Sequence, residues 1–340
     1  MNILSVAYPQ FPIGPNSSGG AEQSLFRLER GIVEAGHRSI VIAAAGSVVR
    51  GELIETPAFG SEISEKDREN SQRIHRGRIE HALCRAPIDL IHFHGLDFSC
   101  YLPDCEIAKL VTLHLPVAWY SPSVFKLPNI RYCCVSEAQA STVPKEERPD
   151  VVLNGIDTGL FKSTCETRRN LLWLGRICAE KGTHVALRVA HRLQLPLVVA
   201  GPVHPFQAHQ EYFANEVQPL LDSQRQWIGA ASLSEKIELL SRARCLLIPS
   251  LVPETSSLVA MEAASSGTPV IAFRSGALPE VVEHGATGFI VDNEDEMASA
   301  VECVSVISAE RCREQARARF DAVRMVRDYL ALYERILTSA

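Results

Sequence analysis

Two glutamates, Glu254 and Glu262, lie in the short stretch VPETSSLVAMEAASSGTPVIA, which begins at Val252. If a helix starts at Ser256, residues eight positions apart are separated by about 12 Å along its axis and by about 80° around it. Carboxylates that act together on a glycosidic bond lie about 5 to 10 Å apart, so this spacing argues against an acid and base pair. It suits two carboxylates that bind hydroxyl groups at the two ends of one elongated ligand. The simpler alternative is one helix-cap acid and one solvated acid.

Two cations stand at the end of another apolar run, in LLWLGRICAEKGTH, where Lys181 follows Arg176 by five positions. A guanidinium fork and an ammonium group together match the charge of a diphosphate. Between the two glutamates, the segment TSSL adds hydroxyl groups and the first N–H groups of a helix, which favour anions. Taken alone, Arg and Lys at loop ends are usually only solvated. In combination with the glutamates, they predict a site for a nucleotide sugar.

A glycine pair follows the first apolar run, in PIGPNSSGGAEQSLFRLERGIVEAGH, where Gly19 and Gly20 precede a helix predicted from about Ala21 to Ala35. Glycine lets backbone N–H groups approach a ligand closely, and a helix N-terminus favours a phosphate. The pattern is not GxGxxG and has no Walker lysine, so neither a dinucleotide site nor a P-loop is indicated. A helix cap without any ligand explains this segment equally well.

Short runs rich in Val, Ile and Leu, each followed by a segment of helical period, must position these residues. This alternation predicts an α/β fold with parallel strands. The first series is NILSVAY, RSIVIAA, DLIHFHG, KLVTLHL and RYCCVS, and the second is NLLWLGR, PLVVAGP, RQWIGAA, RCLLIPS, TPVIAF and GFIVD. We expect two Rossmann-like, doubly wound domains that face each other across a cleft at the carboxyl ends of their strands.

The boundary between the domains is expected where an Asn-Gly turn leads into a polar stretch, near Asp157 to Arg169. We therefore predict domains over residues 1–157 and 158–340. Two amphipathic helical segments end the chain. The last of them, at about residues 321–338, packs on the second domain or crosses back to the first.

The composition excludes several classes of protein. With 340 residues and 46% hydrophobic content, the chain is long enough for two cores. A net charge of -6 argues against a nucleic-acid partner. No apolar run approaches the ~20 residues of a membrane-spanning helix, so any membrane contact is expected to be peripheral. The opening MNILSVAY lacks a signal-peptide pattern, so a cytoplasmic protein is expected, with its ten cysteines reduced.

No metal ion or other cofactor is predicted from these patterns. The sequence contains no CxxC pair. His92 and His94 share one face of a predicted strand, which suggests two metal ligands. No third ligand is evident beside them, so a structural role for both histidines is favoured.

The motifs together resemble family-four retaining glycosyltransferases, whose members have the glycosyltransferase-B fold and need no metal ion. The resemblance rests on GGAEQSLFRLERGIVEAGH, VTLHLP, VSEA, VVLNGID, LGRICAEKG, IGAASLSEKIELLSRARCLLIPS and PETSSLVAMEAASSGTPVIAFRSGALPEVVEHGATGFIVD. It covers nearly the whole chain and is strongest in the second half. It implies transfer of a sugar from a nucleotide diphosphate sugar, by default a UDP-sugar, bound by the second domain. The acceptor, which is a glycan, a lipid-linked molecule or a small molecule, would bind on the side of the first domain.

The resemblance also implies roles for the matching positions. Arg176 and Lys181 would hold the donor diphosphate and stabilise charge on the leaving nucleotide. Glu254 would bind hydroxyls of the transferred sugar, and Glu262 would bind the ribose. The remaining positions would surround the donor: Trp227, Ile228 and Gly229 at the base, Ser256, Ser257 and Leu258 beside the sugar, Gly19 and Gly20 at the phosphates, and His114 near the sugar and acceptor.

Two positions depart from the family's usual pattern. Thr255, Ser256 and Ser257 follow Glu254, where the family often has an aromatic-glycine pair, and Leu115 and Pro116 follow His114, where many members have an acidic residue. The sequence therefore leaves the donor sugar and the acceptor open. Two alternatives to a transferase are a nucleotide-sugar-binding protein without transfer activity and a sugar epimerase or hydrolase on the same fold.

Overall fold

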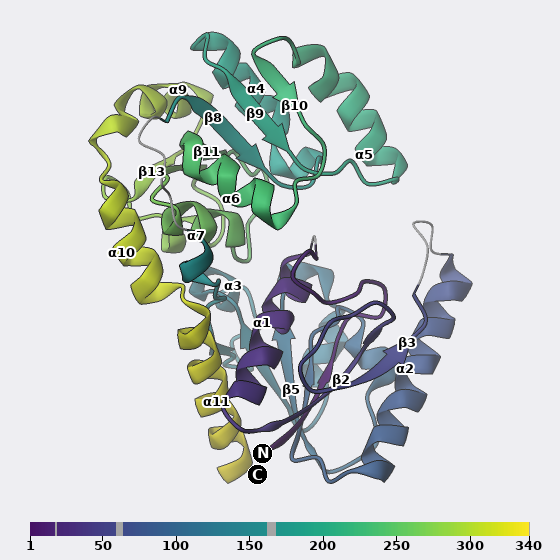
Figure 1. The fold of residues 1–340 in the computed structure, drawn as a ribbon. Helices are drawn as coiled ribbons and strands as arrows, with labels where there is room; N and C mark the ends of the chain where they lie inside the picture. The colour runs from purple at the N-terminus through teal and green to yellow at the C-terminus, as the bar shows by residue number, and fades with distance from the viewer. Residues whose placement is uncertain (18, 59–63, 162–167, 340) are drawn as a thin grey trace. The chain divides into compact units, whose positions relative to one another are not determined.

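The chain is divided into two compact units, which Figure 1 shows as a ribbon. The computed structural model describes residues 1–17, 19–58, 64–161 and 168–339. The first unit comprises Met1–Gly155 together with Ala322–Ala340, and the second comprises Ile156–Asp321. The final segment, which the predicted domains left with the second half of the chain, thus groups with the first unit. Residues 162–167 of the predicted boundary lie outside the described residues.

The first unit is built on a sheet whose strand order is β3-β2-β1-β4-β5-β6-β7. Its strands are β1 (Asn2–Val6), β2 (Arg38–Ala44), β3 (Glu52–Thr56), β4 (Leu90–Phe93), β5 (Ala108–Leu113), β6 (Ile130–Cys134) and β7 (Asp150–Val151). All neighbouring strands are parallel, so their carboxyl ends share one edge. The strand order reverses between β1 and β4, and such switch points are where open α/β sheets bind ligands.

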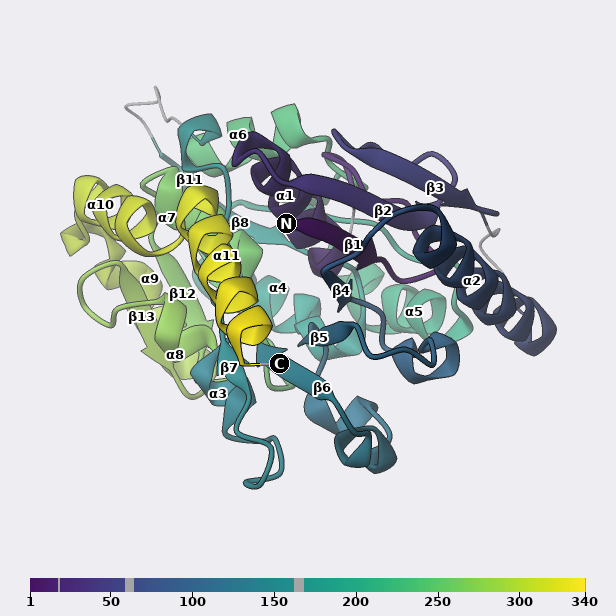
Figure 2. The same cartoon turned by 90° about the horizontal axis from the view of Figure 1, so that it is seen from below.

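The helices of the first unit include the last helix of the chain. They are α1 (Gly20–Glu34), α2 (Glu65–Arg85), α3 (Glu137–Ala140) and α11 (Ala322–Thr338). Figures 1 and 2 show α11 alongside α1. Tyr329 and Tyr333 of α11 are buried with Leu28 of α1 in one apolar cluster. At Gly31 a Cβ atom would lie 2.3 Å from Val326, so glycine permits the two helices to approach closely.

The second unit has the sheet order β10-β9-β8-β11-β12-β13. Its strands are β8 (Asn170–Leu174), β9 (Leu197–Ala200), β10 (Arg225–Trp227), β11 (Ala243–Ile248), β12 (Val270–Phe273) and β13 (Gly288–Val291). These strands are also parallel to their neighbours. The strand order reverses between β8 and β11, so the loops that follow these two strands lie at the switch point of this sheet.

Several helices of the second unit pack on this sheet. They are α4 (Thr183–Arg192), α5 (Gln207–Tyr212), α6 (Leu233–Arg242), α7 (Leu258–Ser265), α8 (Leu278–Val281), α9 (Glu294–Cys303) and α10 (Ala309–Arg319). Trp173 of β8 and Leu187 of α4 are buried in the same apolar cluster as Val301 of α9. Burial of this kind contributes about 1.5–3 kcal/mol for each large apolar side chain.

The predicted fold class is confirmed, because both units are parallel α/β sheets of the Rossmann type. Two strands, β3 and β7, were not predicted from the sequence. The sequence of β3, ELIET, is polar at an edge position, and β7 has only two residues, so neither forms an apolar run. The helix expected from Ser256 begins two residues later, at Leu258. Ser257 has φ -144° and ψ 89°, outside the helical region, so the approach from Glu254 is not helical.

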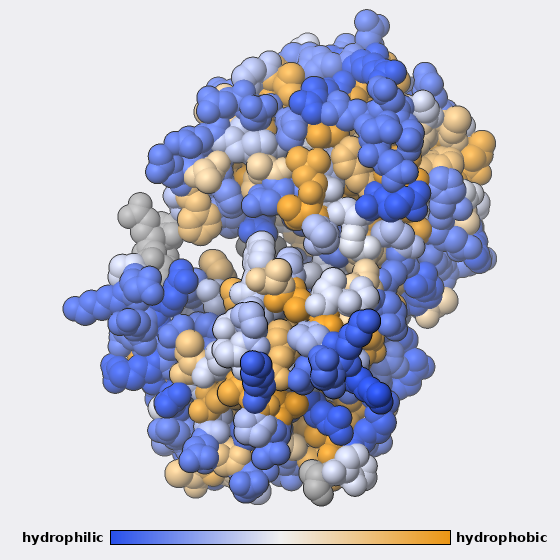
Figure 3. All heavy atoms as spheres, turned by 180° about the vertical axis from the view of Figure 1, so that it is seen from behind, coloured by the Kyte–Doolittle hydropathy of each residue, from blue (hydrophilic) through white to orange (hydrophobic). Residues whose placement is uncertain are grey.

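On the face shown in Figure 3, hydrophilic residues cover most of the area and hydrophobic residues occur in small groups. Within the described parts of the chain, every helix is too short or too polar to cross a lipid bilayer.

Candidate active site

The loops after β8 and β11 are joined to each other at the switch point of the second sheet. Gly182, with φ +66°, ends the first of these loops, and a Cβ atom there would lie 2.1 Å from the carbonyl oxygen of Pro249. The backbone N–H of Leu251 donates to the carbonyl oxygen of Glu180 across 2.8 Å. A glycine is needed at 182 both for the left-handed backbone and for this close approach. The two loops that carry the predicted diphosphate and sugar residues therefore form one assembly.

Lys181 and Glu254 are brought together by these loops. The Lys181 Nζ atom lies 2.6 Å from Oε1 and 2.8 Å from Oε2 of Glu254, and Ser250 donates its hydroxyl to the same carboxylate. The Glu254 side chain is only 10% exposed, whereas that of Lys181 is 28% exposed. An ammonium group has three N–H donors, so Lys181 can hold Glu254 and an anion at the same time. Arg176 is exposed on the same loop as Lys181.

The turn at Gly276 contacts the backbone of Glu254 and fixes its position. This glycine has φ +54°, and a Cβ atom on it would lie 2.2 Å from the carbonyl oxygen of Glu254. The N–H of Ala277 donates to that same carbonyl oxygen across 2.8 Å. The Glu254 carboxylate is thus fixed both at its backbone and at its oxygens.

The segment after Glu254 leads into α7 as predicted in outline. Ser256 is half-buried and Ser257 is buried just before the helix, which begins at Leu258. Ser257 makes no side-chain cap bond to the helix. Because the first N–H groups of a helix have no partner within it, they remain a place for an anion or a sugar hydroxyl to bind.

Glu262 is paired with a different cation from the one that holds Glu254. It lies within α7, is 0% exposed, and its Oε1 atom is 2.6 Å from Nζ of Lys236 on α6. Lys236 also lies over the ring of Phe161, at 5.8 Å from its centroid. Lys236 was not predicted from the sequence, because a single lysine within the amphipathic segment SLSEKIELLSR carries no signal of its partner.

The predicted base-side residues stand at the end of β10. Trp227 and Ile228 are exposed, and the Trp227 ring packs on Phe213 with centroids 4.6 Å apart. The indole N–H of Trp227 donates to the carbonyl oxygen of Gly201, whose own N–H donates to Gly229. A flat aromatic surface is therefore held at the carboxyl edge of the sheet.

A cavity of about 300 Å³ lies under α6, between that helix and strands β8 and β9. Its lining includes Ile228, Leu239, Glu235 and Arg242, but none of the residues around Glu254. We place the candidate site at the charged loops rather than in this cavity, because the loops hold Lys181 against the nearly buried Glu254 carboxylate at the switch point of the sheet.

In the first unit, the glycine pair follows β1 at the carboxyl edge of the sheet. Gly19 is the N-cap of α1 and has extended backbone, with no side-chain cap bond. A Cβ atom on Gly19 would lie 1.8 Å from the carboxylate of Glu22, which is 8% exposed. Gly20 is the first residue of the helix. Glycine at 19 therefore makes room for Glu22, an acid in the first turn that complements the helix dipole.

His114 follows β5 at the same edge and is 8% exposed. One ring nitrogen of His114, Nε2, lies 3.0 Å from Nδ1 of His94. The phenolic oxygen of Tyr120 accepts from the backbone N–H of His114. Burial lowers the pKa of His114 to about 4, so its imidazole is neutral near pH 7. It can exchange hydrogen bonds with a ligand but brings no positive charge.

His92 is embedded in hydrogen bonds of the first unit. Its Nδ1 atom lies 2.8 Å from the Tyr333 hydroxyl, and its Nε2 atom lies 2.7 Å from Thr112 Oγ1. This agrees with the structural role expected for His92.

Most of the second unit matches a known family of proteins. Residues 161–320 match the family model described as "Glycosyl transferases group 1". The chain is 30% identical over 190 residues to "Glycogen synthase" of Mycobacterium tuberculosis H37Rv, which covers 53% of this chain and 44% of that protein. It is 29% identical over 205 residues to "D-inositol 3-phosphate glycosyltransferase" of Corynebacterium efficiens, and this match covers 54% of this chain and 48% of that protein. The chain thus spans about half the length of the curated relatives it matches.

Solved structures resemble the whole chain. Sucrose-phosphate synthase from Thermosynechococcus elongatus superimposes with a TM-score of 0.83 at 17% identity, over 100% of each chain. AviGT4, a glycosyltransferase involved in avilamycin A biosynthesis, gives a TM-score of 0.74 at 21% identity, over 100% of this chain and 99% of that one. Anabaena HepE in complex with UDP and glucose gives a TM-score of 0.77 at 18% identity, over 98% of this chain and 99% of that one. These similarities establish the fold.

Proposed function

Because residues 161–320 match the group 1 glycosyl transferase model and the chain has the glycosyltransferase-B fold, we propose that it transfers a sugar from a nucleotide diphosphate sugar to an acceptor, with retention at the anomeric carbon. The observation that carries the proposal is the assembly of Arg176, Lys181 and Glu254 on two joined loops at the switch point of the second sheet. Cations and a fixed carboxylate side by side match the two parts of such a donor, the diphosphate and the sugar.

In the proposed mechanism, Arg176 and Lys181 stabilise the negative charge that grows on the diphosphate as the bond to the sugar breaks. Glu254 holds hydroxyls of the transferred sugar. Its oxygens already accept from Lys181 and Ser250, so the sugar would meet a carboxylate that is oriented before it binds. The reaction needs no metal ion in this scheme, because the cationic side chains supply the charge.

We propose a UDP-sugar as the donor and a cytoplasmic site of action. The structurally similar HepE forms a complex with UDP and glucose, which supports uridine as the base. Trp227, Ile228 and Gly229 are then the base-side residues, and Ser256, Ser257 and Leu258 lie beside the sugar. In the first unit, Gly19 and Gly20 would close over the phosphates and His114 would lie near the acceptor.

A thermal-shift screen of nucleoside diphosphates and their sugars tests the donor class directly. A ligand that binds only the folded protein raises the melting temperature by mass action. We expect UDP and at least one UDP-sugar to raise it, and nucleoside monophosphates without the second phosphate to do so less. A screen in which no nucleoside diphosphate raises it would contradict the proposal.

The activity itself is tested by release of nucleoside diphosphate from the bound donor. We expect Arg176→Ala and Lys181→Ala each to lower turnover by ~10² or more, because both act on leaving-group charge. Arg274→Ala is a matched control, since Arg274 is a surface residue paired with Asp292. Full donor binding with neither hydrolysis nor transfer would favour a binding protein, and free epimerised sugar would favour an epimerase.

A further inference from the structure

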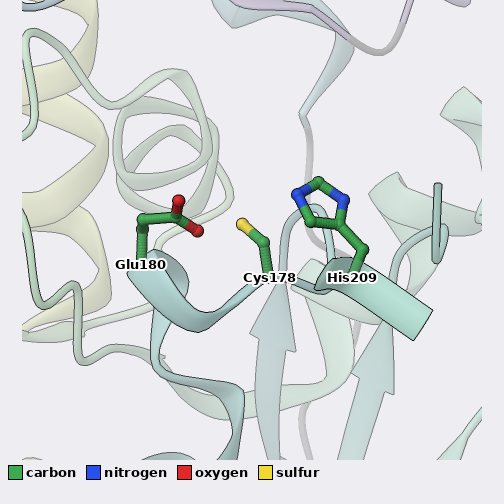
Figure 4. A group of neighbouring side chains, drawn as sticks. All are labelled: Cys178, Glu180 and His209. Atoms are coloured by element: carbon green, nitrogen blue, oxygen red, sulfur yellow. The ribbon is translucent and has the colours of Figure 1, made fainter. Parts of the chain in front are cut away.

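A second cluster with ligand chemistry lies next to Arg176 but takes no part in the proposed transfer. Cys178 and Glu180 come from the loop after β8, and His209 comes from α5. One ligand atom from each of the three lies within 4.8 Å of the other two. Figure 4 shows the Glu180 carboxylate and the Cys178 sulfur pointing toward one another, with the His209 ring facing them from α5.

Glu180 is exposed, but the surroundings of Cys178 and His209 differ from those of an ordinary surface group. Cys178 is 3% exposed. The Nδ1 atom of His209 is buried and lacks a hydrogen-bond partner among the described residues.

We propose that Cys178, Glu180 and His209 form a Zn²⁺ site. Zinc binds sulfur, imidazole nitrogen and carboxylate oxygen at about 2.0 to 2.3 Å in tetrahedral geometry, so its ligands lie about 3.5 Å apart. Small rotations of side chains that are already within 4.8 Å reach this geometry. The combination of a thiol with an imidazole favours zinc over Mg²⁺ or Mn²⁺, which prefer oxygen ligands. Three protein ligands leave the fourth position for water.

The charges of this site balance when zinc binds. The S–H bond of Cys178 breaks, its proton goes to solvent, and a sulfur–zinc bond forms. The thiolate and the Glu180 carboxylate then neutralise the two positive charges of the ion. Arg176 and Lys181 consequently remain the local positive charges for a diphosphate. The ion ties α5 to the loop that carries both cations, and it needs no donor nucleotide in order to bind.

The amount of zinc bound per chain tests the proposed site independently of any transferase activity. The whole chain, treated with a chelator, exchanged into metal-free buffer and titrated with Zn²⁺, should take up one ion per chain and melt at a higher temperature. Cys178→Ser and His209→Ala should lose this uptake, and Glu180→Gln should weaken it. Mg²⁺ at the same concentration should leave the melting temperature unchanged.

Matched variants control for adventitious binding by other thiols and imidazoles. Cys303→Ser and His81→Ala alter exposed residues that do not belong to the cluster, and both variants should retain the full uptake. Substitution with Co²⁺ adds a spectroscopic test, because a thiolate-to-cobalt charge-transfer band should appear in the wild type and be absent from Cys178→Ser. His209 is only half-buried, so loss of zinc uptake in His209→Ala would support the site even if Cys178→Ser failed to fold. Absence of zinc uptake by the wild type, or equal uptake by all variants, would overturn the proposal.

Discussion

The two glutamates of the opening motif have different environments at the level of single residues. The Glu254 side chain is partly exposed and its oxygens accept hydrogen bonds from Lys181 and Ser250, whereas Glu262 is fully buried and paired with Lys236. A buried carboxylate needs a partner, since removal of one member of a buried ion pair costs about 3–5 kcal/mol. Glu262 therefore has a structural role whether or not it also binds ribose.

Substitution of Glu262 separates these two roles. If Glu262 binds ribose, Glu262→Ala should raise the Kd for free nucleoside diphosphate as well as lower stability. Lys236→Met removes the other member of the ion pair and serves as the comparison. Isothermal titration gives the Kd and thermal unfolding gives the stability of each variant. Equal loss of stability in both variants, with unchanged nucleotide Kd for Glu262→Ala, would leave the glutamate with a structural role alone.

At the level of elements, the candidate site depends on two left-handed glycines that let loops touch. Gly182 brings the loop after β8 against Pro249, and Gly276 brings the turn after β12 against Glu254. Both contacts are between backbones, which cannot move aside as a flexible side chain can. The catalytic geometry is therefore set by the packing of loops on loops, with the parallel sheet beneath them.

The substitution Gly276→Ala tests this dependence. A Cβ atom at this position would lie 2.2 Å from the Glu254 carbonyl oxygen, so the loop must shift and turnover should fall along with the melting temperature. Gly285→Ala is the matched control, because Gly285 has φ +80° but a Cβ atom added there would meet nothing within 4 Å. Gly285→Ala should lower the free energy of unfolding by about 1–2 kcal/mol, because of backbone strain alone, and should leave turnover normal. Equal turnover in the two variants would show that Glu254 does not depend on this contact.

Elements with a clear hydrophobic pattern were predictable from the sequence. Runs such as NILSVAY and RCLLIPS became β1 and β11, because a strand buried on both faces needs a continuous apolar run. The polar edge strand β3 offered no such run. The ion pair of Lys236 with Glu262, and the nearness of Cys178 to His209 beside the candidate site, join residues that lie far apart in sequence. Those pairings arise from tertiary packing, which no local pattern encodes.

At the scale of the whole molecule, the first unit holds several histidines in a neutral, buried state. Burial lowers the pKa of His75 and His114 to about 4, and it lowers those of His92 and His94 well below the usual value. The same groups titrate near pH 6.5 in an unfolded chain. The second unit has no matching set among its described residues with pKa values lowered this far.

Acid should therefore unfold the first unit preferentially. Between pH 6.5 and about 4 the unfolded state binds more protons than the folded state, so the free energy of unfolding falls as the pH falls. For His75 the contribution reaches about 3 kcal/mol. Hydrogen exchange resolved by peptide, corrected for the intrinsic effect of pH, should show earlier loss of protection in β4 and β5 than in β8 and β11. His75→Leu should reduce the dependence on pH, and an unchanged dependence would contradict this origin.

The passage of the chain between the two units has a consequence for biosynthesis. The N–H of Ile156 donates to the carbonyl oxygen of Phe320, so the second unit begins and ends at adjacent points. On the ribosome, residues 1–155 emerge before α11, so the apolar face that Tyr329 and Tyr333 cover stays open until α11 has been synthesised. At about 5 to 20 residues per second, this wait is roughly 10 to 35 s. The nascent first unit therefore exposes an apolar face that chaperones can bind until α11 emerges.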